Sequence, residues 1–144
     1  LIHDIGRLIM YAQLPQEMYK AMTRARLKKE ALVSSEQAIL GFTHASVGNA
    51  LLTAWNLPES QRDGLKRHHQ PTTRSHYPLE ISLIHIADII CHALCIGSSG
   101  ETLVPAFNPE AWNVLELDAE ILAEVILEAQ EQIDDLMNIF EMKE

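Results

Sequence analysis

Apolar residues recur along the chain at the three- and four-residue spacings of amphipathic helices, whereas the alternation that is typical of strands is nearly absent. The pattern therefore predicts an all-α fold. Segments 70–78 and 97–107 are rich in polar residues, Gly and Pro and are expected to be loops. Helices are expected over residues 1–12, 15–29, a short stretch ending at Gly41, 44–55, 56–69, 79–96, a short stretch from 108, and from 118 onward. Of these, 79–96 is the most apolar and is expected to lie at the centre.

Helix starts are predicted from residues whose side chains cap helix N-termini. The expected caps are Ser34 or Ser35, Thr43, Asn56, Asn108 and Asp118. The apolar face of helix 44–55 is expected to comprise Val47, Ala50, Leu51, Ala54 and Trp55. The last helix is expected to pack on the domain through Leu117, Ile121, Val125, Ala129, Ile133, Leu136 and Phe140. Trp55 and Trp112 are expected to anchor the core.

Length and composition are those of one globular domain, because the chain has 144 residues of which 47% are hydrophobic. No apolar run reaches the roughly 18 residues that a membrane span needs, and no signal peptide is visible. The first residue is Leu and not Met, so we expect residues 1–144 to be the C-terminal portion of a longer domain. Cys91 and Cys95 lie four residues apart in one predicted helix, where a disulfide would be strained, which favours reduced thiols and a cytoplasmic location.

The net charge of −9 is confined to one end of the chain. Residues 1–115 contain ten acidic and ten basic residues, and residues 116–144 contain ten acidic residues and one Lys. Such a surface does not attract nucleic acid or anionic lipid, so neither is expected as a partner. The acidic helix is either a solvated face or a docking face for a basic partner.

Histidines and aspartates are the candidates for chemistry. Seven histidines are many for this length, and an aspartate within the most apolar helix is costly unless it is paired or coordinated. Imidazole and carboxylate groups that converge from several helices are the usual ligands of metal sites in helical bundles. The alternative is structural, since a lone buried His is usually a hydrogen-bonded core residue and Asp88 can pair with His85 or His92 on its own helix.

Four segments resemble one family. LIHDIGRL, ILGFTHASVGNALLTAWNLPE, KRHHQP and LIHIAD are similar to the HD superfamily, and specifically to the HDOD domain (HD-related output domain) of bacterial signalling proteins. The resemblance covers nearly the whole chain and implies an HD-domain-like helical bundle. HDOD domains usually act as regulatory or output modules without demonstrated catalysis, whereas the related HD-GYP proteins hydrolyse cyclic di-GMP at a site of two or three metal ions.

Carried over residue by residue, the resemblance implies six metal ligands: His3, Asp4, His44, His68, His69 and Asp88. It implies one or two divalent ions, with Fe, Mn or Zn suited to these ligands. In a hydrolase, Asp4 would align the attacking water and Arg7 would contact a phosphate. The sequence departs from the enzymes in two ways, since it has no upstream helix with a first ligand and has QPTTRSHYPLE after His69 in place of the Gly-Tyr-Pro signature.

Three functional hypotheses follow. The first is a non-catalytic signalling module that acts on a protein partner or on an attached sensor or receiver domain. The second is a metal-dependent phosphohydrolase acting on a nucleotide or cyclic dinucleotide, and the third is a structural metal site within a regulatory domain. The alternative interpretation of Arg7 is a solvated charge on a helix. The alternative role of His85 and His92 is to orient Asp88.

Overall fold

The computed structural model describes residues 2–141, and the side chains of Ala119, Leu136, Met137, Ile139, Phe140 and Glu141 lie outside the described part. All regular structure within residues 2–141 is helical, which confirms the predicted all-α class. The helices are α1 (Ile5–Gln13), α2 (Pro15–Lys28), α3 (Leu32–Leu40), α4 (His44–Ala54), α5 (Glu59–Arg67), α6 (Pro78–Ala93), α7 (Pro109–Leu115) and α8 (Ala119–Glu141). None of them combines the length and the apolar character that a membrane span requires.

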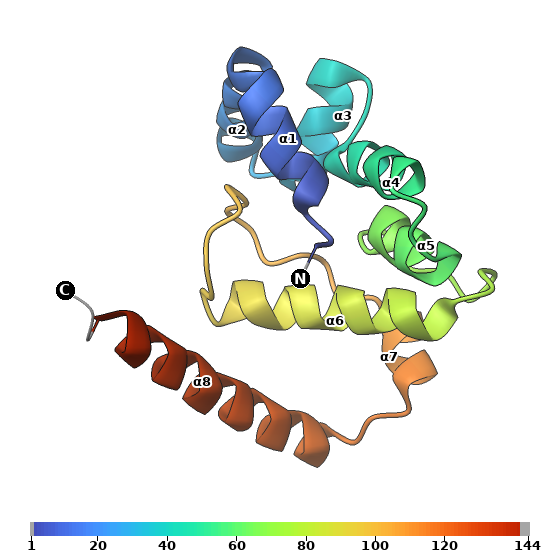
Figure 1. Cartoon of the computed structure of the whole chain (residues 1–144), viewed down its shortest axis with the longest axis vertical. Helices are drawn as coiled ribbons and strands as arrows, with labels where there is room; N and C mark the ends of the chain where they lie inside the picture. The colour runs from blue at the N-terminus through green and yellow to red at the C-terminus, as the bar shows by residue number, and fades with distance from the viewer. Residues whose placement is uncertain (1, 142–144) are drawn as a thin grey trace.

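The helices pack mostly on their neighbours in sequence, and α1 against α4 is the main exception (Figure 1). α2 packs on α3, α4 on α5, α5 on α6, and α6 on α7. Figure 1 shows α1 to α4 at one end of the molecule and α8 running separately along the other end. The N-terminal end of α1 points toward α6, so the segment before α1 lies between the two halves of the helical body.

The close approach of α1 and α4 depends on two glycines. A Cβ atom on Gly6 would collide with the carbonyl oxygen of His44 and would lie 2.6 Å from the backbone nitrogen of Gly48. A Cβ on Gly48 would in turn lie 2.9 Å from a methyl group of Leu65. Because backbone meets backbone at Gly6, the N-terminal turn of α1 lies directly over the first turn of α4.

A small set of fully buried apolar side chains holds this arrangement, and several polar side chains are buried among them. The apolar members below 2% exposure are Met10, Met18, Leu32, Leu52, Leu65 and Ile81, together with Ala21. The polar members include Arg7, Glu36, His44, His68, His85 and Asp88. A core with this many buried ionisable groups is unusual, because each must find a partner to offset the loss of water.

Several predicted helix ends are confirmed. Thr43 caps α4 in a reciprocal capping box with Ser46. Asn108 accepts hydrogen bonds from the first turn of α7, and Asp118 accepts one from the backbone nitrogen of Glu120 at the start of α8. α2 ends in the basic stretch, where Lys29 adopts the left-handed conformation.

Other expected boundaries are wrong. His3 and Asp4 do not lie within a helix, because α1 begins at Ile5. Ser34 and Ser35 lie inside α3, whose first backbone amide, that of Leu32, donates to the carboxylate of the distant Glu101. Asn56 is not a helix cap either, since α5 begins at Glu59 with Pro58 as its cap position.

Two predicted buried faces also differ from the structure. The buried face of α4 comprises His44, Ala45, Gly48 and Leu52, and Trp55 is 60% exposed instead of anchoring the core. The sequence pattern misled because α4 turns its small and polar residues, not its large apolar ones, toward α1. In α8, Ile121 and Val125 are 49% and 52% exposed, so this part of the predicted packing face is not covered by the domain. The predicted contacts of Leu136 and Phe140 lie outside the described side chains.

The α1–α4 contact is tested by Gly6→Ala. We expect this variant to lose roughly 2–3 kcal/mol of unfolding free energy, because overpacking against backbone outweighs the better helix propensity of Ala. Gly64→Ala is the matched control, since its Cβ would meet only the flexible Cδ1 atom of Ile84. Urea denaturation followed by circular dichroism measures both. Equal losses for the two variants would contradict the special role of Gly6.

Candidate metal centre

Four separate segments bring the candidate ligands together. His3 and Asp4 lie in the turn that precedes α1, His44 is the first residue of α4, His68 and His69 directly follow α5, and Asp88 lies in α6. The structure places all six predicted ligand residues in two adjoining groups. The first group is Asp4, His44, His68 and His69, and the second is His3, His68 and Asp88.

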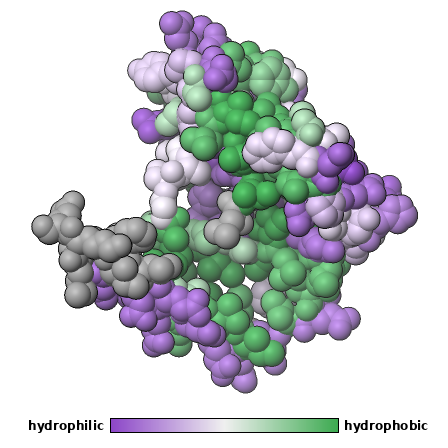
Figure 2. All heavy atoms as spheres, in the orientation of Figure 1, coloured by the Kyte–Doolittle hydropathy of each residue, from purple (hydrophilic) through white to green (hydrophobic). Residues whose placement is uncertain are grey.

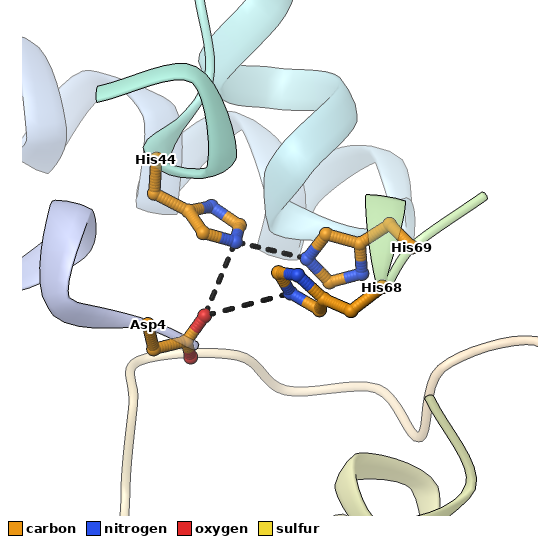
Figure 3. A group of neighbouring side chains, drawn as sticks. All are labelled: Asp4, His44, His68 and His69. Atoms are coloured by element: carbon orange, nitrogen blue, oxygen red, sulfur yellow. Dashed lines mark hydrogen bonds and ion pairs between the residues drawn. The ribbon is translucent and has the colours of Figure 1, made fainter. Parts of the chain in front are cut away.

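The first group is compact, and His44 and His68 within it are buried. Each of its four side chains offers one ligand atom, and these atoms all lie within 4.8 Å of one another. Figure 3 shows three imidazoles and one carboxylate pointing toward a common centre from three different segments. The Nε2 atom of His44 lies 3.1 Å from Oδ1 of Asp4 and 2.9 Å from Nε2 of His69. Nε2 of His68 lies 3.8 Å from the same carboxylate oxygen.

Hydrogen bonds on the outer side of two rings determine which nitrogen faces the centre. Nδ1 of His68 donates to the carbonyl oxygen of Leu65 at 2.6 Å, and Nδ1 of His44 donates to the carboxylate of Glu36 at 2.6 Å. The lone pair of the His68 ring is therefore on Nε2, toward Asp4, and Nε2 of His44 faces the same carboxylate. Such outer partners are what fix the orientation of histidine ligands in metal sites.

Two buried atoms at the centre have no hydrogen-bond partner. These are Oδ1 of Asp4 and Nε2 of His68. Buried polar atoms are nearly always paired, so two unsatisfied lone pairs that face the same point need an explanation. A divalent cation at that point would accept both, and three imidazole nitrogens with one carboxylate oxygen form a donor set that suits such an ion. The residues present therefore fit a metal ion.

Burial also prepares the ligands electrostatically. Burial lowers the pKa of His68 to about 4, although its hydrogen bond to Leu65 opposes the shift, and burial together with the neighbouring His68 lowers the pKa of His69 to about 2. Burial by itself would raise the pKa of Asp4, but the proximity of His44, whose Nε2 lies 3.1 Å from Oδ1, and the charge of Arg7 lower it overall. Both histidines are thus neutral, and Asp4 is ionised, at physiological pH.

Arg7 and Glu36 are buried side chains that contact the first group through Asp4 and His44. The guanidinium of Arg7 is 3% exposed, donates to Oδ2 of Asp4 at 2.9 Å and lies 3.4 Å from Oε1 of Glu36. Glu36 is fully buried and also accepts a hydrogen bond from the backbone nitrogen of His44. Arg7 is therefore not a solvated helix charge. Glu36 was missed in the sequence, where one acidic residue in a short polar stretch looks like an ordinary surface charge.

The second group is more open. Nε2 of His3 donates to Oδ1 of Asp88 at 3.1 Å, and His3 remains 24% exposed. Nδ1 of His92 lies 2.9 Å from the backbone carbonyl of Asp88 and 3.1 Å from its side-chain Oδ1, so this ring does orient Asp88. His85 does not, because its Nδ1 donates to the backbone carbonyl of His68.

A pocket of about 720 Å³ opens beside the second group. His3, Asp4 and Asp88 line its polar end, and the second half of α6 and the loop 96–104 line the rest. The loop is held to the α1 side by a hydrogen bond from the hydroxyl of Tyr11 to the carbonyl of Ser99. Among the described residues that line the pocket, none is Lys or Arg.

The remaining candidates belong to neither group. His76 is exposed in the loop before α6. Cys91 and Cys95 line the pocket, and neither forms a disulfide within the described residues.

Comparisons with known proteins agree with this architecture. The family model of the HDOD domain matches residues 1–71. Among solved structures, the chain is similar to an HDOD domain protein of unknown function from Geobacter sulfurreducens, with a TM-score of 0.75 and 23% sequence identity. The match covers 90% of this chain and 48% of the other, so this chain spans about half the length of that relative. No protein in the search of curated proteins matches the chain.

The buried network is tested by Glu36→Ala. We expect a loss of about 3–5 kcal/mol of unfolding free energy, because the buried Arg7 and His44 both lose a buried carboxylate partner. Asp63→Ala is the control, since Asp63 pairs with Arg67 near the surface and such pairs contribute about 1 kcal/mol or less. Thermal and urea denaturation provide both values. A Glu36→Ala variant as stable as Asp63→Ala would show that the network contributes little.

Proposed function

The chain belongs to the HDOD family, and from this premise we propose that it is a regulatory domain of bacterial signal transduction that holds one divalent metal ion. The observation that carries the metal proposal is the first group, in which four ligand atoms lie within 4.8 Å of one another and two buried lone pairs lack partners. Asp4, His44, His68 and His69 would hold the ion. Zn, Fe and Mn are the ions whose preferences match nitrogen-rich ligands with one carboxylate.

The hydrogen bonds favour one ion over two. His68 belongs to both ligand groups, but its Nδ1 donates to the carbonyl of Leu65. Only its Nε2 lone pair is then available, and one lone pair serves one ion. The first group, with four ligands instead of three, is the stronger competitor for it.

The closed ligand set favours a regulatory role. Structural zinc sites have four protein ligands, whereas catalytic sites keep one position open for water or substrate. In the first group all four positions would be taken by side chains, and Arg7 is occupied by Asp4 and Glu36. An ion there would supply cross-linking, and the side chains would tie the start of α1 to α4 and to the end of α5. A protein partner, or an attached sensor or receiver domain, that moves one of these elements would move the others.

The metal proposal is tested by titrating the metal-stripped protein with Zn²⁺ and with Mn²⁺ in a calorimeter. We expect one ion per chain and a higher melting temperature with the ion bound, because a ligand that binds only the folded state stabilises it. His44→Ala should lose this binding, and His76→Ala, which changes a histidine in an exposed loop, should keep it.

Two results would contradict the proposal. One is binding that is equal in His44→Ala and His76→Ala, which would assign it to surface histidines. The other is a wild-type protein that neither binds an ion nor gains thermal stability from one.

The second candidate function is a metal-dependent phosphohydrolase, and the pocket beside the second group favours it. His3, His68 and Asp88 would hold the ion, and three ligands leave a position open toward the pocket. An ion there would supply an activated water. Asp4 lies at the same polar end and would orient that water. The lack of Lys or Arg among the described lining residues counts against a nucleotide or cyclic dinucleotide, whose phosphates need cationic partners.

Hydrolysis of bis(p-nitrophenyl) phosphate with added Mn²⁺ or Zn²⁺ distinguishes the two functions. The regulatory proposal predicts no turnover above that of the metal ion alone. Turnover by the wild type that is abolished in Asp88→Asn but retained in His76→Ala would instead establish the hydrolase.

A further inference from the structure

The exposed face of α8 is the largest feature that the metal site does not explain. Between residues 116 and 135 the chain has eight acidic residues and no basic one. In the part of the chain that the structure describes, none of these acids forms a salt bridge. Figure 2 shows hydrophilic residues along the outer edge where α8 runs and hydrophobic residues further in.

α8 is amphipathic, and its apolar side is incompletely covered. Ile121, Val125, Ala129 and Ile133 recur every four residues and share one side of the helix. Ile121 and Val125 are about half exposed, whereas Ile133 lines a small pocket with Leu94 at the end of α6. Leu122 and Ile126, on the neighbouring side of the helix, are partly buried, so Ile121 and Val125 form the exposed apolar side of α8.

This exposed apolar side has an acidic edge. Glu124, Glu128 and Asp135 are exposed and lie beside Ile121 and Val125 at helical spacing. We call the surface formed by Ile121, Val125, Glu124 and Glu128 the exposed α8 face.

α2 carries the opposite pattern. Tyr19 and Leu27 are 72% and 80% exposed on one face of this helix, which are high values for large apolar side chains. Lys20 and Arg26 flank them and are exposed. Residues 15–30 contain five basic and two acidic residues, so this segment carries a net positive charge.

We propose that the exposed α8 face binds α2 of a second copy of this chain, so that two chains exchange this contact in a two-fold dimer. Apolar side chains would meet apolar side chains, and Lys20 and Arg26 would face Glu124 and Glu128. The contact cannot form within one chain, because α2 and α8 lie at opposite ends of the molecule (Figure 1). Pairing of α8 with α8 is opposed by the eight acidic residues on each copy.

The reciprocal arrangement also provides the surface area that a stable interface must bury. One pair of short helices buries less surface than a stable interface needs, and a two-fold axis doubles the contact. The exchange is closed, so it ends at two chains instead of continuing as a filament.

Sedimentation velocity over a range of protein and salt concentrations tests the proposal. We expect a dimer whose dissociation constant rises with salt, because exposed charge pairs at its rim are screened. Lys20→Glu/Arg26→Glu should weaken the dimer by about tenfold or more, and Glu124→Lys/Glu128→Lys should do the same, because each places like charges opposite one another. Arg74→Glu and Glu80→Lys change exposed charges elsewhere and should leave dimerisation unchanged.

Mixing the two double variants is the decisive step. Each alone should be monomeric, and an equal mixture should recover association, because the reversed charges on one chain then face the reversed charges on the other. Circular dichroism confirms that each variant is folded. A wild-type chain that remains a monomer, or a dimer that both double variants leave unchanged, would overturn the proposal.

Discussion

The buried carboxylate of Glu36 is the interaction on which the rest of the site depends. It accepts hydrogen bonds from both the backbone and the ring of His44 and lies beside the guanidinium of Arg7. Three helices are thereby joined through charged groups in the interior, with α3 supplying Glu36, α1 supplying Arg7 and α4 supplying His44. A buried charge is costly when unpaired, so this network strongly favours the arrangement in which these opposite charges lie together.

The network also determines what the site can do. By accepting the Nδ1 hydrogen bond of His44, Glu36 directs Nε2 toward Asp4, and Arg7 holds the other oxygen of that carboxylate. The candidate ligand atoms are thus oriented by the protein itself. The same contacts hold Arg7 against Asp4 and Glu36, and Arg7 does not line the pocket, which is one physical reason to favour a binding role over hydrolysis.

Much of the fold could be predicted from the sequence because it follows from local rules. The all-helical class follows from apolar periodicity, and the caps at Thr43, Asn108 and Asp118 follow from side chains that bond to nearby amides. The six candidate ligand residues were predicted through the family resemblance, and all six lie in the two groups.

What could not be predicted depends on contacts distant in sequence. Glu36 lies near His44 only because α3 folds back beside α4, and Glu101 bonds the start of α3 across 69 residues. The exposure of Trp55 reflects which face of α4 the glycine contact turns inward, a choice that apolar periodicity alone does not reveal. The open face of α8 is of the same kind, since an amphipathic pattern predicts a buried face but not which surface buries it.

The most direct test of the metal proposal is an anomalous difference map from a crystal grown with Zn²⁺ and measured on both sides of the zinc absorption edge. The account predicts one peak enclosed by Oδ1 of Asp4 and ring nitrogens of His44, His68 and His69, at the distances of roughly 2.0–2.2 Å that zinc ligands have. A map with no peak there, or with its peak at His3 and Asp88 facing the pocket, would contradict it.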